Sequence, residues 1–505
     1  MSEQPNLLVL MADQLTPGAL SAYGNRVSKT PHIDALAREG VVFDSFYCNS
    51  PLCAPSRFSW LTGRLPSAIG GYDNAAELPA AAPTFAHYLR RAGYLTILSG
   101  KMHFCGPDQL HGFEERLTTD IYPADFGWTP DWRRFAERPS WYHTMDSVTQ
   151  AGPCERTNQI DFDDEVVFSA RQRLYDLARG RDRRPFCMVV SMTHPHDPYT
   201  IPTPYWDRYA GAEIDMPRVR LSPQELDPHS KRLRHVIGLE LQPVTDAQVR
   251  AARRAYYGAV SYVDDQVGAM LAALRGAGFA ERTIVCVLVD HGDMLGERGL
   301  WYKMNFFEPS ARIPFIVHAP GRFRPRRVRE SASLIDLLPT FCELGGAAPG
   351  EFATPLDGTS LVPQLGGAAG RDEVIGEYLG EGAIAPLVMI RRGDHKFVHS
   401  PVDPDQLYDT AADPDERENL AGSPAHAARV AALRAEVARR WDLARVHEEV
   451  LASQRRRHLV YAALRSGSYA PWDHQPRRDA SRLYIRNDQD LNDLEAMARF
   501  PRPGA

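Results

Sequence analysis

The sequence predicts an α/β protein in which a large central sheet is flanked by helices. Continuous apolar runs at residues 6–12, 185–192 and 283–289 are typical of strands buried on both faces. Helical patterns alternate with these runs, and the longest covers residues 247–277, whose apolar stripe we assign to the core. Such alternation of strands and helices is typical of an α/β fold.

A smaller C-terminal α+β subdomain is expected after the central sheet. Residues 346–370 are rich in proline, glycine and alanine, which indicates a boundary. We place the catalytic domain at residues 1–365 and the subdomain, with its tail, at 366–505. The other expected elements are helices at residues 31–37, 84–93, 333–344 and 425–465, and strands at 41–47, 96–98, 388–391, 396–398 and 406–409, the last three antiparallel.

Composition limits the possible functions. The 505 residues carry 58 lysines and arginines against 64 acids, a net charge of −6, and lack a basic run suited to nucleic acid. The seven cysteines are scattered and odd in number, which favours reduced thiols in a cytoplasm. No apolar stretch approaches the roughly 20 residues of a membrane span, and the first predicted strand leaves no room for a signal peptide. We therefore expect a cytoplasmic, enzyme-sized protein without nucleic-acid or membrane partners.

Cys53 lies where a helix is expected to begin. The apolar positions that follow have helical spacing, so Cys53 would meet free backbone N–H groups, which favour an anion. Arg57 is one turn further along the same side and could neutralise an anionic ligand. The alternative is a small buried cysteine beside a surface arginine.

Polar residues follow four of the predicted strands. Asp13 and Gln14 end the first, Lys101 and His103 follow residues 96–98, and Asp290 and His291 end the most apolar strand, with Lys303 downstream; His194 and His196 follow residues 185–192. Ligands of open α/β sheets bind at the carboxyl ends of strands, and carboxylates there suit a hard divalent cation. The alternatives are turn or cap residues, solvated edge charges and histidines bonded to the backbone.

Residues 105–160 form a long insertion with few periodic elements. It contains Phe113, Tyr122, Phe126, Trp128, Trp132, Phe135, Trp141 and Tyr142. This aromatic content argues against disorder. Aromatic faces can hold a quaternary ammonium group by cation–π attraction, although a local hydrophobic cluster explains the same residues equally well.

The segment Cys53-Ala54-Pro55-Ser56-Arg57, completed by Thr62-Gly63, resembles the sulfatase signature C-x-P-S-R-x-x-x-x-T-G. The stretches 100–103, 193–198, 290–299 and 413–420 resemble further sulfatase motifs. The resemblance implies an alkaline-phosphatase-like fold with a mixed central sheet. It also implies that Cys53 becomes formylglycine, whose hydrate is the nucleophile, with a formylglycine-generating enzyme as a partner in maturation.

The same resemblance assigns roles to individual residues. A divalent ion (Ca²⁺, Mg²⁺ or Mn²⁺) would be held by Asp13, Gln14, Cys53, Asp290 and His291. Arg57, Lys101 and Lys303 would surround the sulfate with positive charge. His196 or Lys303 would protonate the leaving oxygen, and His103 would deprotonate the second diol hydroxyl so that sulfate is released.

Stretches outside these motifs (72–77, 106–114, 119–128 and 471–476) resemble the choline sulfatases within that family. This implies choline-O-sulfate as the substrate, with Trp128 and Glu381, near His143, at the trimethylammonium group and Asn74 at the sulfate. The chain departs from the subfamily pattern at Thr144 and Asn492, which leaves another headgroup open. Because the tail at 466–505 has little core of its own, we expect a homodimer or homotetramer formed through it.

Two alternatives remain at this stage. The first is a phosphonate monoester or phosphodiester hydrolase, or a broader aryl or alkyl sulfatase, that uses the same site. The second is a non-catalytic binding protein for a sulfated or quaternary-ammonium solute, which the full set of catalytic residue types speaks against.

Overall fold

The computed structural model describes residues 4–347, 352–476, 483–484 and 489–501. Its central sheet has eight strands in the order β11-β2-β10-β9-β1-β7-β4-β5. The strands are β1 (Asn6–Ala12), β2 (Val41–Phe43), β4 (Leu95–Gly100), β5 (Glu115–Arg116), β7 (Phe186–Ser191), β9 (Thr283–Val289), β10 (Phe315–His318) and β11 (Arg326–Val328). The predicted mixed α/β sheet is confirmed, since β10 runs antiparallel to β9 and β2 whereas the other pairs are parallel.

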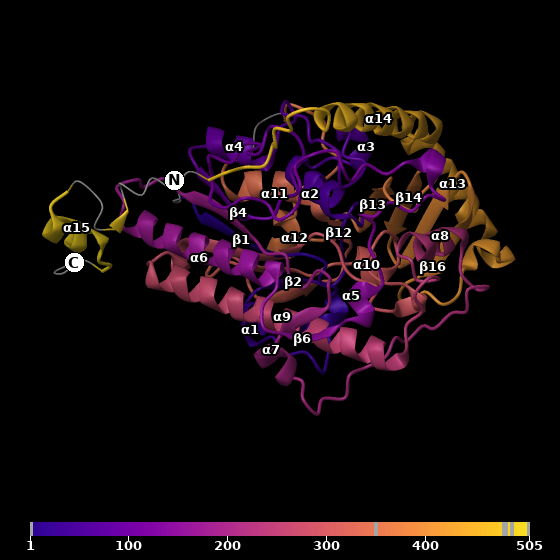
Figure 1. Ribbon diagram of the computed structural model, residues 1–505, viewed down its shortest axis with the longest axis horizontal. Coiled ribbons are helices and arrows are strands. Elements are labelled where there is room, and N and C mark those ends of the chain that lie inside the picture. Colours follow the sequence, from indigo (N-terminus) through magenta and orange to yellow (C-terminus); the bar gives the residue numbers. More distant parts are fainter. Residues whose placement is uncertain (1–3, 348–351, 477–482, 485–488, 502–505) are drawn as a thin grey trace.

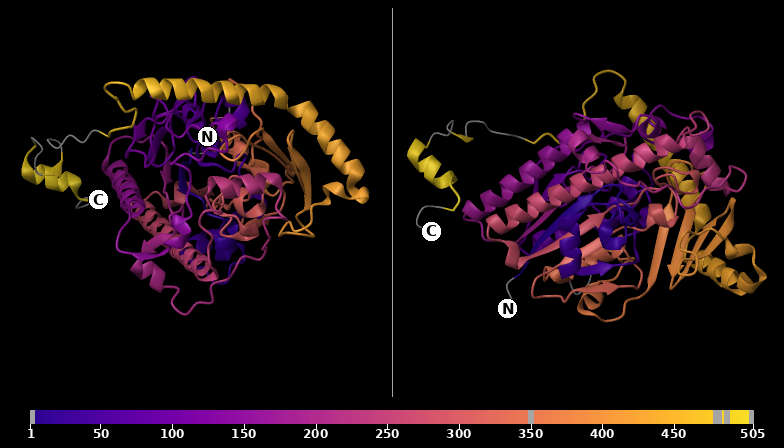
Figure 2. Two further views of the ribbon diagram at one scale, coloured as in Figure 1. Left: turned by 45° about the vertical axis from the view of Figure 1, so that its right-hand side comes forward. Right: turned by 90° about the horizontal axis from the view of Figure 1, so that it is seen from below.

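Helices cover both faces of this sheet. Figures 1 and 2 show α6 (Asn158–Arg179) and α9 (Asp246–Gly276) side by side along one face, where α9 also contacts α1 (Pro31–Glu39). The opposite side carries α2 (Cys53–Thr62), α4 (Phe85–Arg91) and α11 (Leu337–Leu344), which contact one another (Figure 1). Burial of both sheet faces explains why the central strands are apolar along their whole length.

The C-terminal part contains the predicted antiparallel sheet. Its four strands are β13 (Glu373–Tyr378), β14 (Leu387–Arg392), β15 (His395–Ser400) and β16 (Asp403–Asp409). The sheet packs on α13 (Ala427–Arg440) through a separate apolar cluster that includes Ile390, Phe397 and Leu433. The boundary at residue 365 remains a prediction.

Short elements connect these layers. The remaining strands form two pairs: β3 (Phe46–Tyr47) with β12 (Ala332–Ser333), and β6 (Gly152–Cys154) with β8 (Thr200–Pro202). The remaining α-helices are α3 (Pro66–Ile69), α5 (Asp146–Thr149), α7 (Thr203–Asp207), α8 (Pro228–Val236), α10 (Glu308–Ala311), α12 (Val362–Gly366), α14 (Leu443–Leu464) and α15 (Leu491–Ala498). No helix of the described residues is both long and apolar enough to cross a membrane. All seven cysteines are free thiols.

The tail divides into two parts. Its first part packs on the body of the same chain, where Trp472 contacts Phe126 and the Asp473 carboxylate accepts from the Ala124 amide at 3.2 Å. Helix α15 buries none of its residues and extends from one end of the molecule (Figure 1). Just after α15, the Phe500 ring contacts Tyr175 of α6 in the same chain, with 5.9 Å between ring centres. A covering partner for α15 itself remains a prediction.

Candidate active site

The buried acids Asp13 and Asp290 meet at the carboxyl edge of the central sheet. Strands β1 and β9 are adjacent and parallel, with Ala12 paired to Val289, so the residues that follow lie side by side. Both carboxylates are fully buried. Gly292 allows the chain after Asp290 to pass close to another segment, because a Cβ there would lie 2.0 Å from the Pro309 carbonyl oxygen.

Arg57 joins the two carboxylates. Its Nη2 lies 2.8 Å from Asp13 Oδ2 and its Nε 2.9 Å from Asp290 Oδ2, while Nη1 donates to the Lys101 carbonyl oxygen and the Ser191 hydroxyl. Burial by itself would lower the pKa of Arg57, but the two acids outweigh it and raise the pKa. Arg57 is therefore a permanent buried cation that holds the carboxylates in place.

Cys53, the first residue of α2, completes a compact group of potential metal ligands. Its Sγ lies 3.1 Å from His291 Nε2 and 4.0 Å from Asp13 Oδ1. One ligand atom each from Asp13, Cys53, Asp290 and His291 lies within 4.8 Å of the others. Two carboxylates, one imidazole and the group at position 53 form a donor set that fits a divalent cation. Burial alone would raise the pKa of Asp13, but Lys101, His196 and Arg57 hold it well below its usual value.

Lys101 and His103 approach Cys53 from the end of β4. The Lys101 ammonium is buried, pairs with Asp13 and lies 4.2 Å from the centre of the Tyr122 ring. His103 has a left-handed backbone (φ 61°), and its amide donates to Asp120 at 2.8 Å. Burial lowers the pKa of His103, although an interaction with the Cys53 side chain acts in the opposite direction. The expected lysine–histidine pair is thus brought to position 53.

A hydrogen-bonded chain of side chains reaches Cys53 from the other side. The Lys303 ammonium donates to Gln14 Oε1 at 2.6 Å and to His196 Nε2 at 2.7 Å. The side-chain nitrogen Nε2 of Gln14 donates to Asp293 Oδ2 at 2.7 Å. Both polar ends of Gln14 are therefore engaged with protein groups, and a role for Gln14 as a metal ligand remains a prediction.

Lys303 and His196 carry different charges. Burial lowers the pKa of Lys303, but the acidic groups of Cys53, Asp197 and Asp13 outweigh it and raise the pKa above its usual value. Burial, with Lys303 nearby, lowers the pKa of His196 well below its usual value. Because Lys303 can only donate, His196 Nε2 is the acceptor, and His196 Nδ1 donates to the Asp197 carbonyl oxygen at 2.7 Å.

A cavity opens in front of Cys53. It is lined by Cys53, Asn74, Tyr122, Trp128, Trp141, Tyr142, His143, His196, Val236, Lys303, Met304 and Glu381. All four residues that the sequence associates with substrate, Asn74, Trp128, His143 and Glu381, are therefore in one cavity with Cys53. The described tail residues 489–501 contribute nothing to this lining, so Asn492 lies away from the cavity within a single chain.

Glu381 is a buried acid in the lining of the same cavity. Its side chain is 4% exposed, and its Oε2 has no hydrogen-bond partner among the described residues. Burial raises its pKa to about 7. A buried carboxyl group that lacks a partner is costly unless a ligand supplies one. The position therefore suits a cationic ligand group.

Several residues of the site were not singled out from the sequence. Asp197 contacts His196 and His143 at 3.2 and 3.3 Å, and the Tyr302 ring stacks on His143. Tyr122, Trp141 and Tyr142 were recognised only as members of an aromatic set, which the cluster alternative explained equally well. The signal available for Asp197 was its position directly after His196; Tyr302 offered none.

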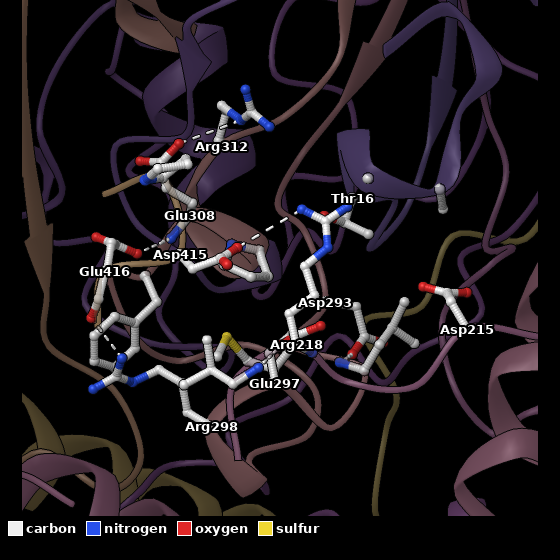
Figure 3. Close-up of a pocket in the computed structure, with 18 of the residues that line it drawn as sticks. Thr16, Asp215, Arg218, Asp293, Glu297, Arg298, Glu308, Arg312, Asp415 and Glu416 are labelled. Atoms are coloured by element: carbon white, nitrogen blue, oxygen red, sulfur yellow. Dashed lines mark hydrogen bonds and ion pairs between the residues drawn. The ribbon is translucent and has the colours of Figure 1, made fainter. Parts of the chain in front are cut away.

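A second cavity has Asp293, but not Cys53, in its lining. Figure 3 shows that its charged side chains largely face one another: Arg312 pairs with Glu308, Arg218 with Asp415, and Arg298 donates to the Glu416 carbonyl oxygen. Because these charges already have partners, this cavity offers a ligand less uncompensated charge than the cavity at Cys53.

Comparison with known proteins decides the family. The sulfatase family profile matches residues 5–347, which include every motif described above except the turn at 413–420. The chain belongs to the sulfatase family. Two further profiles match this sulfatase in its C-terminal part: "N-sulphoglucosamine sulphohydrolase, C-terminal" at residues 296–442 and "Choline sulfatase enzyme C terminal" at residues 448–500.

Individual relatives place this sulfatase more narrowly. It is 48% identical to a choline-sulfatase of Rhizobium meliloti (strain 1021) over 99% of both chains. It is 26% identical to an arylsulfatase of Clostridium perfringens over 80% of this chain and 89% of the relative. The phosphonate monoester hydrolase of Agrobacterium radiobacter has the same fold, with a TM-score of 0.68 and 24% identity over 90% of this chain and 96% of its own. The alkaline-phosphatase-like fold expected from the sequence is thereby confirmed.

Proposed function

We propose that this sulfatase hydrolyses choline-O-sulfate to choline and sulfate. The observation that carries the proposal is the cavity whose lining joins Cys53 and Lys303 to aromatic rings and to Glu381, whose Oε2 has no hydrogen-bond partner among the described residues. A small ester with an anionic sulfate at one end and a quaternary ammonium at the other matches this distribution of charge. The 48% identity to a choline-sulfatase along the whole chain supports the same substrate.

The reactive groups at the sulfate end belong to position 53 and to a metal ion. Formylglycine formed from Cys53 by a formylglycine-generating enzyme supplies, as its hydrate, the oxygen nucleophile of sulfatases. Asp13, Asp290, His291 and position 53, with Gln14 as a further expected ligand, would hold a divalent ion of the Ca²⁺, Mg²⁺ or Mn²⁺ type, which would supply Lewis acidity.

Side chains of this chain neutralise the sulfate and move protons. The buried ammonium groups of Lys101 and Lys303 flank Cys53 and stabilise negative charge on the sulfate oxygens, while Arg57 holds Asp13 and Asp290. The charge state of the pair favours Lys303 over His196 as the proton donor to the leaving oxygen, because Lys303 is charged and His196 accepts from it. His103 is placed to take the proton from position 53 that releases sulfate.

At the headgroup end, aromatic rings form the walls and one acid forms the base. Trp128 and Trp141 stack at 6.3 Å between ring centres, and Tyr142 lies edge-on to Trp141. Such rings attract a trimethylammonium group, and the apolar wall excludes the water that would screen Glu381. The headgroup therefore gains a desolvated cation–π contact together with a charge partner.

The first test compares substrates. After mass analysis has shown the aldehyde on the Cys53 peptide, kcat/KM is measured for choline-O-sulfate, an aryl sulfate and an aryl phosphonate. We expect choline-O-sulfate to be preferred by at least about 30-fold, because a cationic group desolvated against aromatic rings contributes roughly 2 kcal/mol or more. An equal or faster rate on the aryl sulfate would contradict the headgroup assignment, and a preference for the phosphonate would favour a phosphonate hydrolase.

A second prediction concerns pH. The negative charge of Asp73 raises the pKa of Glu381 further, and the positive charge of Lys303 lowers it. The neighbouring Tyr142 and Tyr378 are neutral, because burial raises the pKa of each. The Glu381 carboxyl group is charged above about pH 7 and neutral below it, so the cationic headgroup of the substrate is bound less well as pH falls. We expect the ratio of kcat/KM for choline-O-sulfate to that for an alkyl sulfate with an uncharged alkyl group to fall about tenfold from about pH 8 to about pH 6.

The alkyl sulfate with the uncharged alkyl group serves as the internal reference, because catalytic groups that titrate affect both substrates alike. Glu381→Gln should give a low ratio that does not change with pH. A wild-type ratio that is constant across this range would contradict the role of Glu381.

We further propose that the chain forms a homodimer or homotetramer in which α15 contacts a neighbouring subunit. The support is that α15 buries no residue within its own chain and exposes Leu491 and Met497. Light scattering should show an oligomer, whereas a monomer at micromolar concentration would contradict the proposal.

A further inference from the structure

Helix α14 lies along the outside of the molecule (Figure 1; Figure 2, left). Its residues Gln454, Arg457 and Tyr461 are spaced three and four apart, so they point to the same side of the helix. Gln454 and Arg457 are buried although both are polar. A buried polar face on a helix indicates specific contacts with the segment underneath.

The strongest of these contacts is an ion pair between Arg457 and Asp73. Two parallel bonds of 2.6 and 2.7 Å join the guanidinium to the carboxylate, and both side chains are buried. Asp73 directly precedes Asn74, which lines the cavity and whose Oδ1 accepts from the Ala54 amide at 3.0 Å. The guanidinium thus holds the segment that presents Asn74 beside Cys53.

The same guanidinium also reaches the aromatic wall. Arg457 Nη1 donates to the Thr129 hydroxyl at 3.2 Å, one residue after Trp128. Gly127, on the other side of Trp128, lies against Tyr461, because a Cβ on Gly127 would be 3.1 Å from the Tyr461 hydroxyl. Consecutive turns of α14 therefore contact the residues on either side of Trp128, whose side chain lines the cavity.

Gln454 extends this support to Glu381. Its Oε1 accepts from the Trp132 amide at 3.1 Å, and the Trp132 indole nitrogen donates to the Gly380 carbonyl oxygen at 3.0 Å. Gly380 directly precedes Glu381. One face of α14 therefore supports Asn74, Trp128 and Glu381, which come from three separate parts of the chain.

We propose that this face of α14 sets the geometry of the headgroup pocket and that Arg457 is its principal positioning residue. The inference rests on the proposed function, since it concerns selectivity for an ester with a cationic headgroup. It gives a physical role to the start of the region that matches "Choline sulfatase enzyme C terminal", at residues 448–500. Arg457 touches no lining group that would contact the substrate directly; it acts through Asp73 and Thr129.

The test uses Arg457→Lys in the full-length, formylglycine-bearing enzyme. Lysine keeps the positive charge but cannot make the two parallel bonds to Asp73 and reach Thr129 as well. We expect KM for choline-O-sulfate to rise at least about tenfold while kcat changes less than about threefold. The ratio of kcat/KM for choline-O-sulfate to that for an alkyl sulfate with an uncharged alkyl group should fall at least about tenfold.

Two further variants separate positioning from general damage. Arg455→Lys is an equivalent change at an exposed position two residues away on α14. It should leave KM for choline-O-sulfate and the selectivity ratio at their wild-type values. Gln454→Met removes only the bond to Trp132 and should lower the selectivity ratio a few fold without loss of folding.

The outcomes distinguish this inference from the proposed function. A wild-type enzyme without preference for choline-O-sulfate overturns both. If the wild type has the preference, an Arg457→Lys ratio equal to the wild-type ratio overturns only the positioning role. An equal loss on both esters, in Arg457→Lys and in Gln454→Met, also overturns it, because such a loss indicates a general structural effect.

Discussion

Replacing Cys53 with alanine is expected to abolish turnover while the protein stays folded. Cys53 is the residue that the cavity, Lys101, His103, Lys303 and the potential metal ligands all surround. Removal of a covalent nucleophile costs roughly 10⁴-fold or more in kcat, and the remaining groups cannot replace it. Alanine is a good helix residue at the start of α2, so the free energy of unfolding should change by no more than about 1–2 kcal/mol.

The measurement is single-turnover hydrolysis of choline-O-sulfate together with urea unfolding. Cys342→Ala provides the matched control, because Cys342 is also a buried cysteine in a helix but lies in α11, outside the cavity. It should keep wild-type turnover. Retention of more than about 1% of the wild-type rate by Cys53→Ala would show that another group is the nucleophile.

Replacing Arg57 with methionine is expected to destabilise the fold by about 3–5 kcal/mol, the usual cost of removing one partner from a buried ion pair. The change leaves the buried carboxylates of Asp13 and Asp290 without their shared cation. Lys101 still pairs with Asp13, so the larger uncompensated charge is at Asp290. Turnover should fall as well, because the geometry at position 53 depends on these acids.

Urea unfolding at neutral pH measures this effect. Arg134→Met, which removes an exposed arginine paired with Glu137, should leave stability unchanged. If the two acids form a metal site, added divalent cation should stabilise the Arg57→Met variant more than the wild type. A loss of less than about 1 kcal/mol would mean that Arg57 does not stabilise the two carboxylates.

Elements with strong local signals were predicted well. The strand at 283–289 coincides with β9, and the helix expected at 247–277 lies at Asp246–Gly276, where the Thr245 side chain caps its first turn. The expected strand at 41–47 is instead two strands, β2 and β3, in different sheets, separated by Asp44 and Ser45. The break depends on pairing with β10 and β12, which are distant in the chain.

Strand β13 was missed for a related reason. Its sequence contains Glu373 and Glu377, which argue against a buried strand. Glu377 is nevertheless 1% exposed, because the Ser67 backbone and hydroxyl and the Trp441 indole donate to its carboxylate. Those donors come from α3 and from the end of α13, so no local pattern reveals them.

The sequence by itself determined which chemical groups stand at the ends of the central strands and at the start of α2. Parallel strands carry their terminal residues to one edge, so Asp13, Lys101 and Asp290 had to converge on Cys53. Tertiary packing alone decided the charges and partners: Gln14 bonded to Lys303, Glu381 Oε2 without a hydrogen-bond partner in the described part of the chain, and Arg457 paired with Asp73 across 384 residues. Such contacts depend on burial and on distance in space, and neither is recorded in the order of neighbouring residues.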